Sequence, residues 1–174
     1  MLILPEWIAA AQGAMRLTRV PTSSQIAQFG EESGWGRHEP AGSNDPFGIK
    51  AFNPADPRVI DMTTEVVGGR VIHEDQPFRV FKDLGAAFLF HAQLIANDRR
   101  YAPAMAALPN LELFVRLMAK VYATQPGYDV MLLNIIRGDN LAQYDRLAPA
   151  PAATDLTAAR AAMPPSLVDI GPGQ

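Results

Sequence analysis

The sequence contains no cysteine among its 174 residues, which excludes disulfide scaffolds, thiol catalysis, iron–sulfur clusters and cysteine-ligated zinc sites. It also lacks an excess of positive charge: the net charge is −3, so a basic surface that tracks nucleic-acid phosphates is not expected. The histidines, His38, His73 and His91, lack metal-binding spacing. No apolar run approaches the roughly 20 residues of a membrane span. We therefore expect no metal, no other cofactor, no nucleic-acid partner and no membrane insertion.

The composition favours a single folded domain followed by a tail. Hydrophobic residues make up 48% and charged residues 19% of the chain, enough for one compact core. We expect this domain over residues 1–147. Residues 148–174 are rich in alanine and proline and predict an appendage, with a short helix near 155–162. The amino terminus lacks a basic leader, and Pro5 and Glu6 interrupt its apolar residues, so no signal peptide is expected.

Apolar spacing predicts that most of the domain is helical. The second expected helix has a start signal, because Thr22 can cap it and Gln25 lies three residues later, as in a capping box. Gly34 suits the left-handed residue that ends this helix. The expected helices cover residues 6–17, 22–34, 83–95, 111–123 and 128–140.

A smaller part of the chain predicts strands. Gly68 and Gly69 separate two β-branched runs, residues 64–67 and 70–73, which is typical of a hairpin turn. Residues 78–81 predict a third strand, and residues 43–57 predict a loop. The fold class is therefore α+β, mainly helical with one small antiparallel sheet.

The strongest signal for chemistry lies at the end of the second expected helix. Glu31 and Glu32 fall in its last turn, where the helix dipole disfavours a carboxylate. A neighbouring like charge and the apolar ring of Trp35 also raise a carboxyl pKa. A carboxyl that stays protonated near neutral pH is the proton donor of glycoside hydrolysis. The alternative is two solvated helix residues, with Gly34 as a cap and Trp35 as a core side chain.

Five segments together resemble a known family. Residues 26–36 read Ile-Ala-Gln-Phe-Gly-Glu-Glu-Ser-Gly-Trp-Gly and resemble the Ala-Gln-…-Glu-Ser-Gly-Trp-Gly signature of the bacterial endo-β-N-acetylglucosaminidases of glycoside hydrolase family 73. Residues 44–50 are similar to its Asn-Asn-Leu-Phe-Gly-Ile-Lys, residues 78–81 to its Phe-Arg-x-Tyr, and residues 122–128 to its Tyr-Ala-Thr-Asp-Pro-x-Tyr. Thr64 and Glu65 lie in a hairpin, as the family's second carboxylate does. The likeness spans about Pro21 to Tyr144.

The resemblance implies a lysozyme-like fold, in which a helical lobe and a β lobe flank a sugar-binding groove. It places the general acid on Glu32, the second carboxylate on Glu65 and the active-site tyrosine on Tyr122. It also implies that Asn44, Trp35 and Phe47 bind substrate. Other interpretations stay open: Glu65 as a solvated strand residue, Tyr122 and Trp35 as core residues, and Phe47 as a loop anchor. Asp61, Glu74 and Asp75 compete with Glu65 for its role.

Two of these segments contain departures from the family pattern that bear on the expected site. Asp45 and Pro46 stand where the family has Asn and Leu, which changes the loop beside the expected groove. Gln125 stands where the family has Asp, so any help from that acid is absent.

The resulting hypothesis is a peptidoglycan hydrolase that cleaves the β-1,4 bond after N-acetylglucosamine in cell-wall glycan strands. Cleavage on the muramic-acid side, by a lysozyme or a lytic transglycosylase, is one alternative. A non-catalytic murein-binding module is another. Because no signal peptide is expected, the hypothesis includes delivery by phage-type lysis, as for an endolysin, or by a specialised export route. The sequence indicates no oligomeric state.

Overall fold

The computed structural model of the chain describes residues 2–67 and 70–146; the side chains of 64–67 and 70–72 lie outside that description, as does the expected tail, residues 148–174. The elements in this part are α1 (Pro5–Thr18), α2 (Thr22–Ser33), β1 (Arg58–Val67), β2 (Arg70–Arg79), α3 (Leu84–Asn97), η1 (Arg99–Tyr101), α4 (Ala102–Ala106), α5 (Leu111–Tyr122), α6 (Tyr128–Gly138) and η2 (Leu141–Asp145). The expected mainly helical α+β class is confirmed. No helix in the described ranges has the length and hydropathy to cross a membrane.

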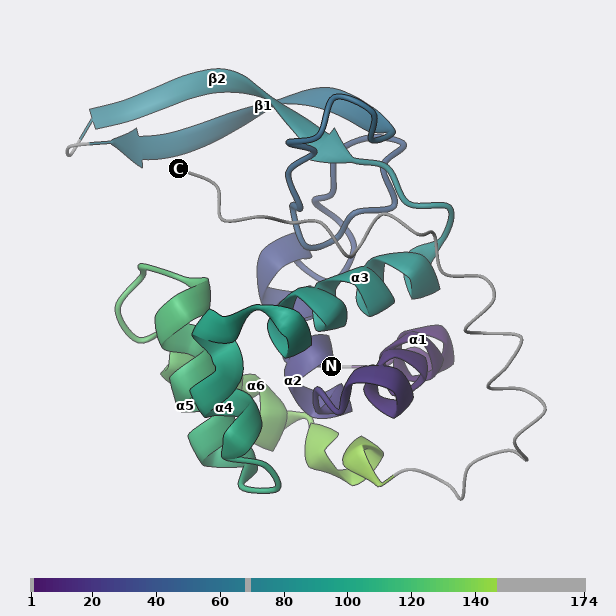
Figure 1. Cartoon of the computed structure of the whole chain (residues 1–174), viewed down its shortest axis with the longest axis vertical. Coiled ribbons are helices and arrows are strands. Elements are labelled where there is room, and N and C mark those ends of the chain that lie inside the picture. The colour runs from purple at the N-terminus through teal and green to yellow at the C-terminus, as the bar shows by residue number, and fades with distance from the viewer. Residues whose placement is uncertain (1, 68–69, 147–174) are drawn as a thin grey trace.

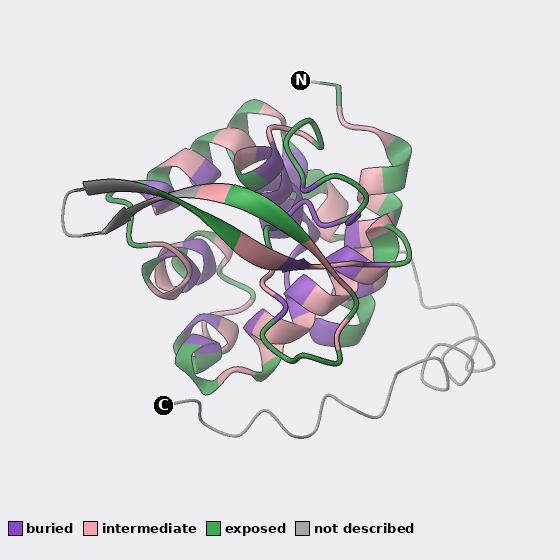
Figure 2. Ribbon diagram, turned by 90° about the horizontal axis from the view of Figure 1, so that it is seen from above, coloured by how far each residue is buried: buried purple, intermediate pink, exposed green. Residues whose placement is uncertain are grey.

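The molecule has a helical lobe with the β-hairpin arching above it (Figure 1). Helix α1 packs against α2 and α3, while α2 also contacts α6. Buried residues concentrate in this helical lobe, and the hairpin residues whose burial is described, 58–63 and 73–79, are mostly exposed or half-buried (Figure 2). Large apolar side chains with essentially no exposure include Phe29, Phe88, Phe114, Ile26 and Ile95. Backbone hydrogen bonds join the end of the hairpin to the loop before it: the Arg79 N–H donates to the Ile49 carbonyl (2.8 Å) and the Val80 N–H to the Pro57 carbonyl (2.9 Å).

The expected hairpin is confirmed, but its strands are longer than the sequence pattern indicates. β1 and β2 pair antiparallel from Arg58 opposite Arg79 to Val67 opposite Arg70. The separate third strand expected over 78–81 is wrong, because 78–79 are the end of β2. Pro77 lies inside β2 without interrupting its pairing with β1. Its carbonyl points away from β1 and accepts from the Ala51 N–H (2.8 Å), and a backbone N–H at this position would point the same way. The N–H that proline lacks therefore costs no hydrogen bond to β1. The expected turn, residues 68–69, lies outside the described residues.

The start of α2 also differs from the expectation. Thr22 is the first residue within the helix rather than its cap, and the side chain of Gln25 donates to the Val20 carbonyl (2.9 Å). The cap comes from η2 instead: Asp145 accepts hydrogen bonds from the Ser23 N–H (2.8 Å) and hydroxyl (2.7 Å). A carboxylate there suits the positive end of the helix dipole. The capping-box interpretation is therefore wrong.

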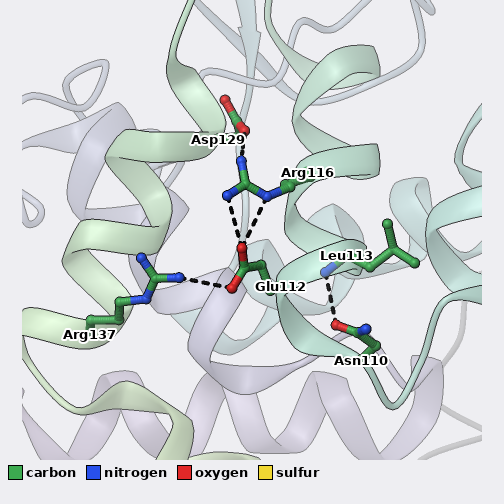
Figure 3. A network of polar contacts seen from close by, with 6 residues as sticks. All are labelled: Asn110, Glu112, Leu113, Arg116, Asp129 and Arg137. Carbon is green, nitrogen blue, oxygen red and sulfur yellow. Dashed lines mark hydrogen bonds and ion pairs between the residues drawn. The ribbon is translucent and has the colours of Figure 1, made fainter.

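An ion-pair network ties α5 to α6 (Figure 3). Arg116 binds Glu112 one turn earlier (2.8 Å) and Asp129 in the first turn of α6 (2.8 Å), and Arg137 binds the other Glu112 oxygen (2.9 Å). Exposed pairs of this kind contribute little stability individually. They link two helices that also pack directly against each other, and these helices carry Tyr122 and Tyr128.

Candidate active site

A cavity of about 400 Å³ lies between the helical lobe and the hairpin. Glu32, at the end of α2, lines one side. The loop before β1 contributes Asp45 and Phe47, and the hairpin contributes Asp61 and Thr63. The expected arrangement of a groove between a helical and a β lobe is therefore present, with Glu32 on its wall.

The local sequence around Glu32 fixes the end of α2. Gly34 has a φ of 55°, the left-handed conformation expected for the residue that terminates the helix. The Ser33 hydroxyl donates to the Phe29 carbonyl (2.6 Å) and accepts from the Gly36 N–H (2.8 Å). These bonds hold the turn tightly, so Glu32 projects from a rigid segment.

Trp35 packs beneath this turn and is not among the residues that line the cavity. Its ring stacks on Trp7, with centroids 5.7 Å apart, and meets Phe29 edge-on at 6.3 Å. The ring also covers Gly30, where an added Cβ would lie 2.6 Å from it. Gly30 thus lets Trp35 approach α2 and brace the turn that carries Glu32.

The electrostatics of Glu32 favour a protonated carboxyl. Although the residue is solvent-exposed on one side, the protein around its carboxyl raises the pKa by desolvation, and the charge of Glu31 raises it further. The Tyr128 hydroxyl donates a hydrogen bond to Glu32 Oε1, which lowers the pKa and partly opposes the burial. The sequence predicts a raised pKa from the charge of Glu31, the helix dipole and the apolar ring of Trp35; in the structure burial is the largest cause, Glu31 adds to it, and Tyr128 acts in the opposite direction.

The tyrosine that bonds Glu32 is not the one to which the family resemblance assigns the active-site role. Tyr122 lies behind Tyr128 with their rings stacked in parallel, 5.8 Å apart, and burial raises the pKa of both hydroxyls. Tyr128 closes the segment 122–128 that carries the resemblance, so its presence was visible in the sequence. Its bond to Glu32 depends on how α6 packs on α2, which no local pattern indicates.

The remaining residues expected at the site have different surroundings. Phe47 lines the cavity and stacks on His91, with ring centroids 4.0 Å apart. Asn44 is exposed, and its side-chain amide donates to the Phe81 carbonyl (2.8 Å), so it ties the loop to the end of the hairpin. Glu65 lies in β1 opposite Ile72, and its side chain lies outside the described residues.

The described ranges, 2–67 and 70–146, contain no group of three or more histidine, aspartate or glutamate side chains that could hold a metal ion. Four carboxyl groups are among the side chains that line the cavity, those of Glu32, Glu39, Asp45 and Asp61. Their chemistry is that of proton transfer and charge stabilisation.

The helical lobe, the hairpin and the carboxyl-lined groove between them define a lysozyme-like glycoside hydrolase fold. The glycoside hydrolase domain of FlgJ from Salmonella typhimurium superposes with a TM-score of 0.64 at 27% identity, over 78% of this chain and 96% of that domain. The family model described as mannosyl-glycoprotein endo-beta-N-acetylglucosaminidase matches residues 8–141. The chain belongs to this glucosaminidase family, whose members are glycosidases.

Curated relatives agree with this assignment. The exo-glucosaminidase LytG of Bacillus subtilis is 32% identical over 142 residues, which cover 78% of this chain and 50% of LytG. The peptidoglycan hydrolase FlgJ of Pseudomonas aeruginosa is 29% identical over 136 residues, 73% of this chain and 34% of that protein. The chain therefore spans half or less of the length of these two relatives.

Proposed function

We propose that this protein hydrolyses the β-1,4 bond after N-acetylglucosamine in the glycan strands of bacterial peptidoglycan, with Glu32 as the general acid. The observation that carries the proposal is the placement of Glu32: its carboxyl lines the groove, has a raised pKa and is oriented by Tyr128. The names of the relatives LytG and FlgJ support the choice of glycan. Such a substrate places the action outside the cytoplasm, and phage-type lysis or a specialised export route stays our proposal for delivery.

In this mechanism Glu32 donates its proton to the glycosidic oxygen as the bond breaks, so the leaving sugar departs as a neutral alcohol. A positive charge then develops on the other sugar. Glu65 is proposed to stabilise this charge or to activate the attacking water; the substrate's own acetamido group is the alternative nucleophile. Asp61, which lines the cavity, competes for the same role.

The proposed role of Glu65 rests on its place in β1. Asp61, Met62 and Thr63 of this strand line the cavity, and Glu65 follows Thr63 by two positions. The distance between the Glu32 carboxyl and the second carboxyl decides whether the reaction inverts or retains the anomeric configuration.

The proposal assigns supporting roles to the other candidate residues. Phe47 presents an aromatic wall to the sugar, since apolar ring faces suit the apolar faces of sugars. Tyr122 positions water or substrate through the stack that it forms with Tyr128. Trp35 and Asn44 act on substrate binding by holding the turn and the loop that border the groove.

Product analysis tests which bond is cleaved. Purified peptidoglycan is digested, the new reducing ends are reduced with borohydride, and the products are identified by mass spectrometry. We expect N-acetylglucosaminitol at the new ends. Muramitol ends would contradict the proposed bond and assign the protein to the muramidases. Anhydromuramic acid ends, which borohydride does not reduce, would assign it to the lytic transglycosylases. Binding of murein without any release of fragments would indicate a binding module.

Tyr128→Phe tests the orientation of the acid. Because the hydroxyl stabilises the charged carboxylate, its removal raises the Glu32 pKa, and the alkaline limb of the pH–rate profile moves to higher pH. The maximal rate falls by about tenfold, since the proton donor loses the group that orients it. Tyr144→Phe, on η2, is the matched control and leaves the limb in place. An unchanged limb in Tyr128→Phe would show that this hydrogen bond does not tune Glu32.

A further inference from the structure

Asp45 is a buried carboxyl group in the loop that forms one wall of the groove. We call residues 43–50 the groove loop. Asp45 is 0% exposed, and its Oδ1 accepts a hydrogen bond from the Phe47 N–H (3.2 Å). Its Oδ2 is also buried and has no hydrogen-bond partner in the described part of the chain. The hydrolytic mechanism above does not use this group.

A buried carboxylate with one unpartnered oxygen is unfavourable in its charged form. Burial raises the pKa of Asp45 to about 7; the N–H groups of Phe47 and Ile49 oppose the rise, Glu39 adds to it, and Arg79 opposes it. Arg79 forms an ion pair with Asp56, so its charge is already matched by another carboxylate. A neutral Asp45 resembles a side-chain amide, with one acceptor oxygen and one donor.

The groove loop is connected to Glu32 through a continuous series of packed rings. Phe47 stacks on His91 with an interplanar angle of 10°, and His91 meets Tyr122 edge-on at 5.6 Å. Tyr122 stacks on Tyr128, whose hydroxyl bonds Glu32. A shift of Phe47 is therefore transmitted through direct contacts to the proton donor.

His91 provides no charge that would compensate an ionised Asp45. Its ring is buried between Phe47 and Tyr122, and neither ring nitrogen has a hydrogen-bond partner among residues 2–67 and 70–146. Burial lowers the pKa of His91 to about 3, so the ring is neutral throughout the physiological range. The titratable or charged groups that face Asp45 are thus Glu39, Arg79 and Tyr122.

We propose that Asp45 is a positioning residue for Glu32 that acts in its neutral form: it holds Phe47 against His91, and its ionisation loosens the groove loop and misplaces the acid. Asp45 does not touch substrate in this proposal. The inference rests on the proposed hydrolytic function of the same groove. It assigns a pH-dependent role to a residue outside the reacting groups.

The test compares Asp45→Asn with the wild type across a pH series. Asparagine keeps the acceptor for Phe47 but cannot ionise. The ratio of its peptidoglycan hydrolysis rate to that of the wild type is expected to be near 1 at about pH 5.5. It is expected to reach about tenfold or more at about pH 8.5, where only about 3% of Asp45 is neutral. Titration of Glu32 affects both proteins and cancels in this ratio.

Thermal melting gives a second readout that does not depend on activity. Because the pKa of Asp45 is higher in the folded protein than in the unfolded chain, the wild type loses stability as pH rises from about 4 to about 7. Asp45→Asn lacks this loss, so its melting temperature is expected to rise relative to the wild type over that range. Glu39→Gln is the matched control, since it removes a neighbouring carboxyl group that lines the same cavity and leaves Asp45 free to ionise.

Asp45→Leu keeps the side-chain volume without the acceptor and is expected to lose activity at every pH. Parallel pH–rate profiles of the wild type and Asp45→Asn, or parallel melting temperatures, would overturn the inference. So would a fully active Asp45→Leu, or an Asp45→Asn that fails to fold. A wild type that releases no fragments at any pH would instead remove the proposed function.

Discussion

Glu32→Gln is expected to lower the rate of peptidoglycan hydrolysis by about 10²–10⁴-fold, the range that general acid catalysis contributes. Glutamine has nearly the same shape and still offers an oxygen to the Tyr128 hydroxyl, but it has no proton to donate to the leaving sugar. The melting temperature is expected to stay within a few degrees of the wild type, because the substitution removes a charge that burial already disfavours. Loss of turbidity and release of soluble fragments measure the rate.

Glu31→Gln is the matched control for this experiment. Glu31 precedes Glu32 on the same helix turn, and its charge raises the pKa of Glu32. Its removal is therefore expected to move the alkaline limb slightly toward lower pH while keeping the maximal rate within a few-fold. If Glu32→Gln cleared cell walls as fast as the wild type, Glu32 would not be the proton donor.

Trp35→Ala is expected to destabilise the protein by about 3 kcal/mol, at the lower end of the range for removing a packed tryptophan because the ring is half-buried. The ring fills the space between Trp7, Phe29 and Gly30, and alanine leaves that space empty beneath the turn that carries Glu32. For a chain of this size the melting temperature falls by roughly 10 °C. Activity falls as well, because the turn loses its support.

Differential scanning fluorimetry or circular dichroism measures this change. Trp35→Phe is expected to recover part of the stability, since a smaller ring still covers Gly30. Phe52→Ala is the control: Phe52 is also aromatic but 84% exposed, so its removal has little effect on melting. A Trp35→Ala protein that melted with the wild type would show that this ring does not brace the turn.

Local patterns in the sequence predict most of the fold. The main helices, the left-handed residue Gly34 and the antiparallel hairpin follow from apolar spacing, glycine and β-branched residues, which act over a few positions. The helix expected over 83–95 is an example: α3 begins at Leu84, and Asp83 caps it, its side chain accepting from the Ala86 N–H (2.8 Å). The short helical segment of residues 99–106 has too few residues for a periodic signal and was not expected.

The features that sequence reasoning missed join residues far apart in the chain. Thr22 and Gln25 fit a local capping box, but Asp145 supplies the cap because η2 packs on α2 and brings a stronger acceptor. Tyr128 bonds Glu32 across 96 positions. The burial of Asp45 likewise depends on contacts that only the assembled fold provides. Motif order therefore indicates which segments meet, whereas their atomic partners depend on packing.

Asp145 closes the amino-terminal end of the helix that bears Glu32, although 122 positions separate it from Ser23. During translation this helix has no such partner until almost all of the described chain has left the ribosome. The same bond limits how the carboxyl-terminal side can be shortened: a module or an affinity tag fused on that side has to follow Arg146. A truncation before η2 would remove the Asp145 cap from the amino-terminal end of α2, the end opposite Glu32.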